Sequence, residues 1–364
     1  MPLDILVGLQ YGDCGKGKVT DSIAENYDTV VRFNGGNNAG HTLKFDGVTL
    51  KLHSVPSGIA HENVLNIISR GCVVNPAELC KEIQEVEIVL GKTLGPDRFR
   101  ISGKCHVITE QNILEDAQKS VNKIGTTGKG IGPTFSAKHA RESLRLSDVI
   151  SQYPPLKKFL LEDDSIVLGQ LELGYNILAE GAQGTWLDID HGEYPYVTSC
   201  NTLASHACTT LGVGINYVRD IIGVFKAYTT RVGNGTLSDE WSKDDPTYKK
   251  IFDVEVGTTT GRNRRCGPLD LPKLKKAIMM NGVTRLVMTK SDMLNGTGFE
   301  VIEDAIHVKV FEPWEQASAG DINFIRFIDY LEDELGIQLS AISNGPDRED
   351  YDYNHGLTRE FMVK

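Results

Sequence analysis

The chain has 364 residues, of which 40% are hydrophobic and 24% charged, so it can bury a substantial core. Acidic residues outnumber basic ones by 49 to 38, which gives a net charge of −11. Because nucleic acids and membrane surfaces bind broad basic faces, this balance argues against both partners, while small anionic molecules could still bind in a local basic pocket.

Short apolar runs bounded by Gly, Asn or Asp recur along the chain and predict strands buried on both faces. They lie at 4–10, 28–34, 63–69, 175–181, 220–228, 284–290 and 337–343. The first run is too short for a signal peptide and leads directly into a glycine-rich loop. Helical patterns fall between the runs. The clearest spans 321–336, with an apolar face between a capping Asp321 and Gly336: Phe324, Phe327, Ile328, Leu331 and Leu335. This alternation predicts an α/β fold with a largely parallel sheet.

The first motif is GDCGKGKV at 12–19, which has the G-x-x-x-x-G-K frame of a phosphate-binding loop. It lies between a predicted strand and a possible helix at 19–27, where glycine N–H groups and a helix N-terminus can cradle a phosphate. A plain glycine turn is the alternative. Val19 replaces the Ser or Thr whose hydroxyl normally sits on Mg²⁺. Asp13 would repel a phosphate unless a metal or an exchangeable proton lies between them.

Two further glycine-rich segments follow. In FNGGNNAGHT, 33–42, His41 stands among glycines and amides and could donate a proton to a phosphoryl oxygen as charge develops. IGTTGKGIGP, 124–133, combines hydroxyls, glycines and one lysine. It could be another anion cradle or, equally well, a flexible surface loop.

Three segments complete the set. The dense polar and aromatic segment 180–201, EGAQGTWLDIDHGEYPYVTSCN, is typical of an ordered binding loop. In GTTTGRNRR, 257–265, three arginines beside threonines suit a carboxylate or phosphate, although a solvated basic run is the alternative. In TKSD, 289–292, Asp292 could accept hydrogen bonds from N1–H and the 2-amino group of guanine, while the Lys290 stem covers the base. This last pattern is short and also occurs by chance.

The seven cysteines are scattered and include no C-x-x-C pair, so we expect reduced thiols rather than a zinc site or a disulfide framework. No apolar run is long enough to span a bilayer. These features predict a cytoplasmic protein.

Taken in order, these segments resemble those of the adenylosuccinate synthetase family, and the resemblance runs from Gly8 to about Arg348. It implies a single large α/β domain, 1–364, with a P-loop-like GTP site, working as a homodimer. It also implies a two-step ligation. Asp13 takes the N1 proton of IMP, and O6 then attacks the γ-phosphate of GTP. The 6-phosphoryl group leaves as the amine of L-aspartate attacks C6.

The resemblance also implies a role for individual residues. The catalytic residues would be Asp13, Lys16, His41 and Gln183. Mg²⁺ would be held by Asp13 and the carbonyl of Gly40, so the hydroxyl that Val19 lacks would not be needed as a metal ligand. GTP would be bound by Gly12, Gly15, Lys16, Gly17, Lys18, Gly40, His41, Thr42, Arg264, Lys290, Asp292, Ser343 and Gly345. The acceptor nucleotide would be bound by Asp13, Asn38, Ala39, Thr127, Gln183, Thr198 and Arg262, with Arg141 reaching its 5′-phosphate from the other subunit. L-Aspartate would be bound by Thr259, Thr260, Arg262 and Arg264.

Several positions depart from the family pattern, namely Cys14 for Glu, Asn37 for His, Lys129 for Arg, and Asn263 within the arginine run. The segment between Leu146 and Leu178 is also short, as in archaeal and viral members. Some viral members act on dGMP and make the 2-amino analogue of adenylosuccinate. Many of those carry Ser in place of Asp13, which favours IMP here, whereas compactness and Cys14 favour dGMP.

Two other functions are alternatives to a ligase. A GTP-binding regulatory module would leave the arginine segment and the 33–42 segment without a role. A Rossmann dehydrogenase is disfavoured because the first loop lacks the G-x-G-x-x-G spacing.

Overall fold

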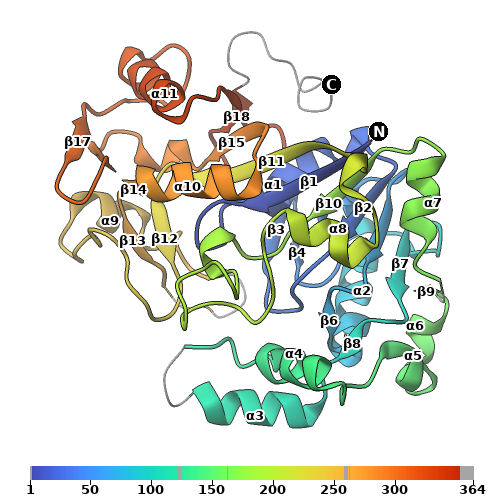
Figure 1. Ribbon diagram of the computed structural model, residues 1–364. Coiled ribbons are helices and arrows are strands. Elements are labelled where there is room, and N and C mark those ends of the chain that lie inside the picture. Colours follow the sequence, from blue (N-terminus) through green and yellow to red (C-terminus); the bar gives the residue numbers. More distant parts are fainter. Residues whose placement is uncertain (1, 121–124, 162, 258–260, 262, 353–364) are drawn as a thin grey trace.

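The computed structural model describes residues 2–120, 125–161, 163–257, 261 and 263–352. Within these residues, ten strands form one large sheet in the order β19-β18-β15-β11-β1-β10-β2-β5-β7-β9 (Figure 1). Neighbouring strands are parallel except for β18 and β19, which are antiparallel. The α/β fold on a mainly parallel sheet is therefore confirmed.

The apolar runs of the sequence all form strands of this sheet. They are β1 (Leu3–Gly8), β2 (Thr29–Arg32), β5 (Leu65–Ile68), β10 (Ile177–Glu180), β11 (Val218–Lys226), β15 (Arg285–Thr289) and β18 (Leu339–Ser343). Three strands of the sheet have no counterpart among those runs: β7 (Phe99–Ser102), β9 (Leu160–Leu161) and β19 (Tyr351–Asp352). Arg100 interrupts the apolar run of β7, and the two edge strands are too short to produce a periodic pattern.

Helices connect most of these strands. In the described residues they are α1 (Lys16–Ile23), α2 (Pro76–Leu90), α3 (Glu110–Ser120), α4 (Ile131–Ala140), α5 (Leu146–Val149), α6 (Pro154–Lys157), α7 (Ile166–Glu172), α8 (Ser205–Leu211), α9 (Pro246–Ile251), α10 (Leu271–Asn281) and α11 (Ile322–Leu335). Short 3₁₀ turns lie at Ala24–Asn26, Ser57–Ala60, Ile150–Gln152, Thr185–Leu187, Ile215–Tyr217 and Ser291–Leu294. In the described part of the chain, no helix combines the length and the apolar composition that a membrane span requires.

Small sheets surround the large one. They are β3 (His41–Phe45) with β4 (Val48–Leu52), β6 (Val73–Val74) with β8 (His106–Val107), β12 (Thr229–Arg231) with β13 (Arg265–Gly267), and β14 (Leu269–Asp270) with β16 (Phe299–Ile302) and β17 (Val308–Phe311). Figure 1 shows α3 and α4 side by side below the large sheet, and α11 at the opposite end of the molecule.

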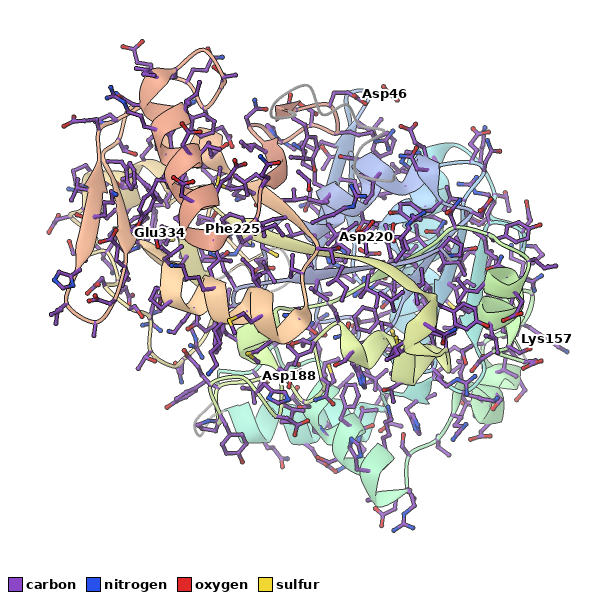
Figure 2. All side chains as sticks on the ribbon, turned by 45° about the horizontal axis from the view of Figure 1, so that its top comes forward. Asp46, Lys157, Asp188, Asp220, Phe225 and Glu334 are labelled. Atoms are coloured by element: carbon purple, nitrogen blue, oxygen red, sulfur yellow. The ribbon has the colours of Figure 1, made fainter. Side chains whose placement is uncertain are left out.

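Apolar side chains are buried on both faces of the large sheet. In β1, Leu3, Ile5 and Val7 contribute to a core cluster shared with α8, α10 and α11, whereas Leu6 contributes to a separate cluster with α1. This division follows from the alternation of side chains along a strand. A third cluster packs α2 and the β3–β4 hairpin against β5 and β7. In Figure 2, Phe225 lies inside the molecule, where it is fully buried, and Lys157 lies at the rim.

Helix α11 has the boundaries that the sequence predicts. Asp321 caps it by accepting hydrogen bonds from two backbone N–H groups, and Gly336 ends it in the left-handed conformation. Its expected apolar face is buried at Phe324, Phe327, Ile328 and Leu331 and partly buried at Leu335. Helix α1 differs slightly from the expected segment, because it begins at Lys16 and not at Val19.

Candidate active site

A cavity of about 680 Å³ lies at the carboxyl ends of the central strands. Its wall includes segments that follow β1, β2, β10, β12, β15 and β18, together with parts of α3 and α4 and residues between them. Open parallel sheets bind their ligands in this position. Most of the expected site residues line the cavity: Gly12, Asp13, Gly15, Lys16, Gly17, Lys18, Asn38, Ala39, Gly40, His41, Thr42, Thr127, Gln183, Thr198, Arg264, Lys290, Ser343 and Gly345.

The other expected residues lie elsewhere. Asp292 is half-buried in the 3₁₀ turn after Lys290 and is not part of the cavity wall. Arg141 is exposed at the C-cap of α4, outside the cavity. Three residues lie outside the described part of the chain: Thr259, Thr260 and Arg262.

The loop between β1 and α1 has the backbone that anion binding requires. Gly12 and Gly15 have left-handed φ angles of 83° and 81°, and α1 begins at Lys16 with its first residues in the cavity wall. A Cβ atom at Gly17 would lie 2.6 Å from the Cβ of His41. Glycine at this position therefore allows α1 and β3 to approach each other closely.

Three non-glycine residues of the cavity wall have the same left-handed conformation. They are Asp13 (φ 50°), Gln183 (φ 58°) and Lys290 (φ 59°). This conformation costs about 1 kcal/mol or more for each residue and persists only where the surrounding contacts hold it. Such strain concentrated around one cavity indicates that these three side chains are positioned for a ligand.

His41 is oriented by a buried carboxylate. Its Nδ1 lies 2.6 Å from Oε1 of Glu180 and 3.0 Å from Oγ of Ser57. Glu180 ends β10 and is fully buried, and it accepts hydrogen bonds from the Ser57 hydroxyl at 2.6 Å and the Ser57 N–H at 2.9 Å. With Nδ1 engaged in this way, Nε2 is the ring nitrogen left for a ligand.

The charges around this pair set its protonation. Burial alone would raise the pKa of Glu180, but His41, Arg32 and Ser57 outweigh it and hold the pKa at about 2. Burial lowers the pKa of His41, assisted by Arg32 and Lys16 and opposed by Glu180. These two pKa shifts oppose each other. A lowered pKa of His41 favours the neutral ring, whereas the low pKa of Glu180 depends most on a charged ring. Glu180 is ionised in either case, since Ser57 and Arg32 stabilise its charge even beside a neutral imidazole. A phosphoryl group entering the cavity would favour the charged His41.

A second network begins at Asp13, which is partly exposed to the cavity, and continues through buried residues. Its Oδ2 lies 2.9 Å from Nε of Arg264, whose Nη1 lies 2.6 Å from Oε2 of Glu255. Glu255 also pairs with Lys226 at 3.0 Å and with Lys290 at 2.8 Å. Burial would raise the pKa of Asp13, but Arg264 and Lys226 overcome it and lower the pKa, so the carboxylate is ionised.

Gln183 joins two of the expected segments. The ammonium of Lys16 donates to its backbone carbonyl, and its Nε2 donates to Oδ1 of Asn38 at 3.3 Å. Its Oε1 is buried and has no hydrogen-bond partner among the described residues. Because buried polar atoms are almost always paired, this oxygen points to a donor supplied by a ligand.

Lys18 ties the glycine loop to the turn after β18. Its ammonium donates to Oγ of Ser343 and to the carbonyl of Gly345, both at 2.7 Å, and to the carbonyl of Asp350 at 2.9 Å. It also lies 4.3 Å from the ring centre of Tyr351. Burial lowers its pKa to about 8, against the nearby acidic residues that raise it. The turn is thereby held beside the segment expected to bind a nucleotide.

Sequence reasoning missed two groups of residues. The buried polar and charged residues behind the wall were assigned no role: Ser57, Glu180, Lys226 and Glu255. The wall itself also contains residues that no motif singled out, among them Tyr11, Lys44, Asp116 and Asn234. One signal was present, because Glu180 and Lys226 are charged residues that directly follow the apolar stretches 177–179 and 221–225.

The model of the adenylosuccinate synthetase family matches residues 5–160 and 152–312, most of the chain. The chain belongs to this family. The adenylosuccinate synthetase of Bacteroides fragilis is 39% identical over 420 aligned positions, which cover 96% of this chain and 98% of the relative. That of Helicobacter acinonychis is 37% identical over 412 positions, which cover 95% and 98%. The alignments are longer than this chain, so these family members carry segments that it lacks.

Two solved structures have the same fold. The fully ligated adenylosuccinate synthetase of Plasmodium falciparum superimposes with a TM-score of 0.86 at 28% identity, covering 97% of this chain and 100% of the other. The succinoaminodeoxyadenylate synthetase of cyanophage S-2L, bound to dGMP and to dATP as an energy donor, gives a TM-score of 0.75 at 21% identity, covering 99% and 97%. At that identity, the second likeness concerns the fold alone.

Proposed function

We propose that the chain is a ligase that joins L-aspartate to C6 of IMP, with cleavage of GTP to GDP and phosphate, and so makes adenylosuccinate for purine biosynthesis. Family membership supports this reaction. The observation that carries it is the meeting, in one cavity, of a glycine loop bearing Asp13, a histidine held by a buried carboxylate, and Arg264.

In the first step, Asp13 accepts the N1 proton of IMP, and the electrons of the N1–H bond flow through the ring to O6. O6 then forms a bond to the γ-phosphorus of GTP while the bond to the β–γ bridging oxygen breaks and GDP leaves. The ionised state of Asp13 suits a base, although the cations around it make it a weak one. The ion pair with Arg264 must therefore loosen as the proton is transferred.

His41 and Lys16 act on the phosphoryl group in transit. A donor on Nε2 of His41, backed by the charge of Glu180, can stabilise the negative charge that spreads over the phosphoryl oxygens. The ammonium of Lys16, nearly buried at the start of α1, adds a positive charge at the same place. Gln183 offers its unpartnered Oε1 to the acceptor nucleotide.

In the second step, the amine of L-aspartate attacks C6, and the 6-phosphoryl group leaves with the C6–O6 bond electrons as phosphate. Guanidinium groups bind carboxylates in a two-pronged manner, so Arg264 suits one aspartate carboxylate. Thr259, Thr260 and Arg262 complete this subsite in our proposal. Asn38, Ala39, Thr127 and Thr198 would hold the acceptor nucleotide, as the cavity wall allows.

We propose Mg²⁺ as the cofactor, held by the carboxylate of Asp13 and the carbonyl of Gly40. Both residues line the cavity, and Mg²⁺ is commonly bound by one or two carboxylates together with substrate phosphates and water. No group of three or more His, Cys, Asp or Glu side chains suited to a metal occurs in the described residues, so phosphate oxygens would have to provide many of the ligands. When bound, the ion would neutralise charge on the phosphates.

Guanine is proposed to lie between Lys290, Asp292 and the turn at Ser343 and Gly345. The bracing of that turn by Lys18 supports this placement, because the base and phosphate sites are then held at a set separation. GTP phosphates would contact Gly12, Gly15, Gly17 and Thr42 in the cavity wall.

Arg141 is proposed to reach the acceptor phosphate of a second subunit in a homodimer. Its exposure at the end of α4, outside its own cavity, supports this assignment. Mixing Asp13→Ala chains with Arg141→Leu chains should then restore turnover that neither variant has alone. No gain on mixing would refute a shared site.

The extent of one domain over 1–364 and a cytoplasmic location stay predictions.

The proposed reaction is tested by following phosphate release with Mg²⁺, GTP and L-aspartate while IMP, dIMP, GMP and dGMP are offered in parallel. We expect turnover with IMP and none without aspartate. Turnover chiefly on dGMP would replace IMP as the acceptor, and no turnover on any nucleotide would refute the ligase.

A further inference from the structure

The carboxylate of Glu255 is surrounded by cations. Its Oε2 contacts Nη1 of Arg264 at 2.6 Å and Nζ of Lys226 at 3.0 Å, and its Oε1 contacts Nζ of Lys290 at 2.8 Å. The hydroxyl of Tyr228 donates to the same Oε1. A carboxylate has about four lone-pair sites, so these four donors satisfy it completely.

This group is anchored from several directions. The backbone N–H of Arg264 donates to the carbonyl of Glu255 at 2.8 Å, and Val256 pairs with Asn263 beside it, so Glu255 and Arg264 stand at the stem of one loop. Lys226 ends β11 next to Phe225, whose interior position Figure 2 shows, and Lys290 follows the neighbouring strand β15. One carboxylate thus connects the arginine segment to two central strands.

Two of these cations line the cavity and have a proposed ligand each. Arg264 lies between Glu255 and Asp13, where aspartate and the transferring phosphoryl group would meet, and Lys290 lies where guanine would bind. Glu255 and Lys226 are both fully buried and do not line the cavity, so neither would contact a ligand directly. A buried charge without a partner is strongly destabilising, so Lys226 supplies the counter-charge that lets Glu255 stay ionised.

We propose that Glu255 is a positioning residue that sets Arg264 and Lys290 together, and that Lys226 is its buried counter-ion. This inference rests on the proposed function, because it takes from it the ligands of Arg264 and Lys290. It predicts that loss of one buried carboxylate weakens the sites for L-aspartate and for GTP at the same time.

The test compares Glu255→Gln, Lys226→Met and the double variant with the parent chain. Glu255→Gln leaves Lys226 unpaired, so it should lower the melting temperature and raise the KM for L-aspartate about tenfold or more, equivalent to about 1.4 kcal/mol. The KM for GTP should rise several-fold with it. The double variant removes both buried charges, so it should recover much of the melting temperature while both KM values stay high. If Glu255 and Lys226 were only a structural ion pair, both KM values of the double variant would return to the parental values together with the melting temperature.

The control is Asp4→Asn, at the opposite end of the central strand β1. Asp4 is fully buried and pairs with Arg219 at 2.6 Å, so its loss should also lower the melting temperature. We expect unchanged KM values in this variant. Equal increases in KM here would mean that the readout reports lost stability alone, and the inference would fall.

Two failures can be told apart. If the parent chain does not turn over IMP, GTP and L-aspartate, the proposed function is refuted, and the inference is then decided by calorimetric titration of GTP into parent and double variant. An active parent beside a double variant with parental KM values would refute the inference alone. In either setting, equal GTP affinity in parent and double variant contradicts a positioning role for Glu255.

Discussion

Glutamine at position 180 would keep the shape of the buried side chain that holds His41 and remove its charge. The pKa of Glu180 is lowered from 4.5 to about 2, a shift that corresponds to about 3 kcal/mol of stability at neutral pH, at about 1.36 kcal/mol per unit. Because the folded-state pKa is depressed, this contribution is fully present above the unfolded value of 4.5 and is lost as the pH falls toward 2. Glu180→Gln should therefore be less stable than the parent by about 3 kcal/mol near pH 7.

Urea unfolding of both proteins at two pH values measures this difference. Protonated Glu180 resembles glutamine, so about 1 kcal/mol of the difference should disappear by about pH 3.5. Turnover should also fall by about 100-fold, because His41 loses the charge that supports its proton. Ser57→Ala is the matched control, since it leaves the charge of Glu180 in place and removes only the share of the pKa shift that the Ser57 hydroxyl causes. The pH-dependent part of its cost should therefore be clearly smaller than that of Glu180→Gln. A difference between parent and Glu180→Gln that is equal at both pH values would refute the ionised, His41-supporting carboxylate.

Three further substitutions probe the cavity wall. Lys18→Met removes three hydrogen bonds to the turn after β18, so the KM for GTP should rise about tenfold with little change in kcat; an unchanged KM would exclude this bracing role. Asp292→Asn places an amide donor against the donors of guanine, and the preference for GTP over ATP in kcat/KM should fall about 100-fold, whereas an unaltered ratio would remove Asp292 from the guanine site. Gly17→Ala puts a methyl group 2.6 Å from the Cβ of His41, so turnover should fall about 100-fold while IMP still binds; normal turnover would mean that His41 needs no such placement.

The architecture could be predicted from the sequence because the central strands coincide with short apolar runs bounded by Gly, Asn or Asp. β1, β10, β15 and the second half of β11 are largely buried on both faces, so each appears as a mostly β-branched or apolar run. The same reasoning could not find β9, which has two residues at the edge of the sheet. The order of the strands in the sheet could not be predicted either, because β1 pairs with β10 and β11, which lie far from it in the chain. Such pairings depend on three-dimensional packing and leave no local signal.

The lining of the candidate site was predictable where glycine-rich segments reveal a constraint on the backbone. Glycine-rich segments identified the loops of Asp13 and His41, because phosphate approach demands glycine whatever the rest of the chain does. The supporting charges were not predictable, because Glu180 and Glu255 meet their partners only across the fold. In sequence, a buried glutamate paired with a distant lysine looks the same as a glutamate on the surface.

Val19 stands where most phosphate loops carry Ser or Thr, and the fold explains why it is tolerated. It is fully buried in the core cluster that contains Ile23, one turn later on α1, and it does not line the cavity. A hydroxyl at this position would therefore lie in the core, where the Gly15 carbonyl one turn earlier already accepts from the Val19 N–H at 3.1 Å. We expect Val19→Thr to lower the free energy of unfolding by about 1 to 2 kcal/mol, the cost of burying a poorly paired hydroxyl.

The Mg²⁺ dependence of turnover separates this explanation from its rival. If position 19 faces the core, the Mg²⁺ concentration for half-maximal turnover should be the same in Val19→Thr and in the parent. Val19→Ala is the control, because it lowers stability through a cavity and offers no oxygen. A threonine variant that is as stable as the parent and reaches half-maximal turnover at a lower Mg²⁺ concentration would show that this side chain reaches the phosphates. In that case the loop would be an ordinary phosphate loop that lacks only the hydroxyl ligand of Mg²⁺, and the proposal that Asp13 binds the metal would be refuted.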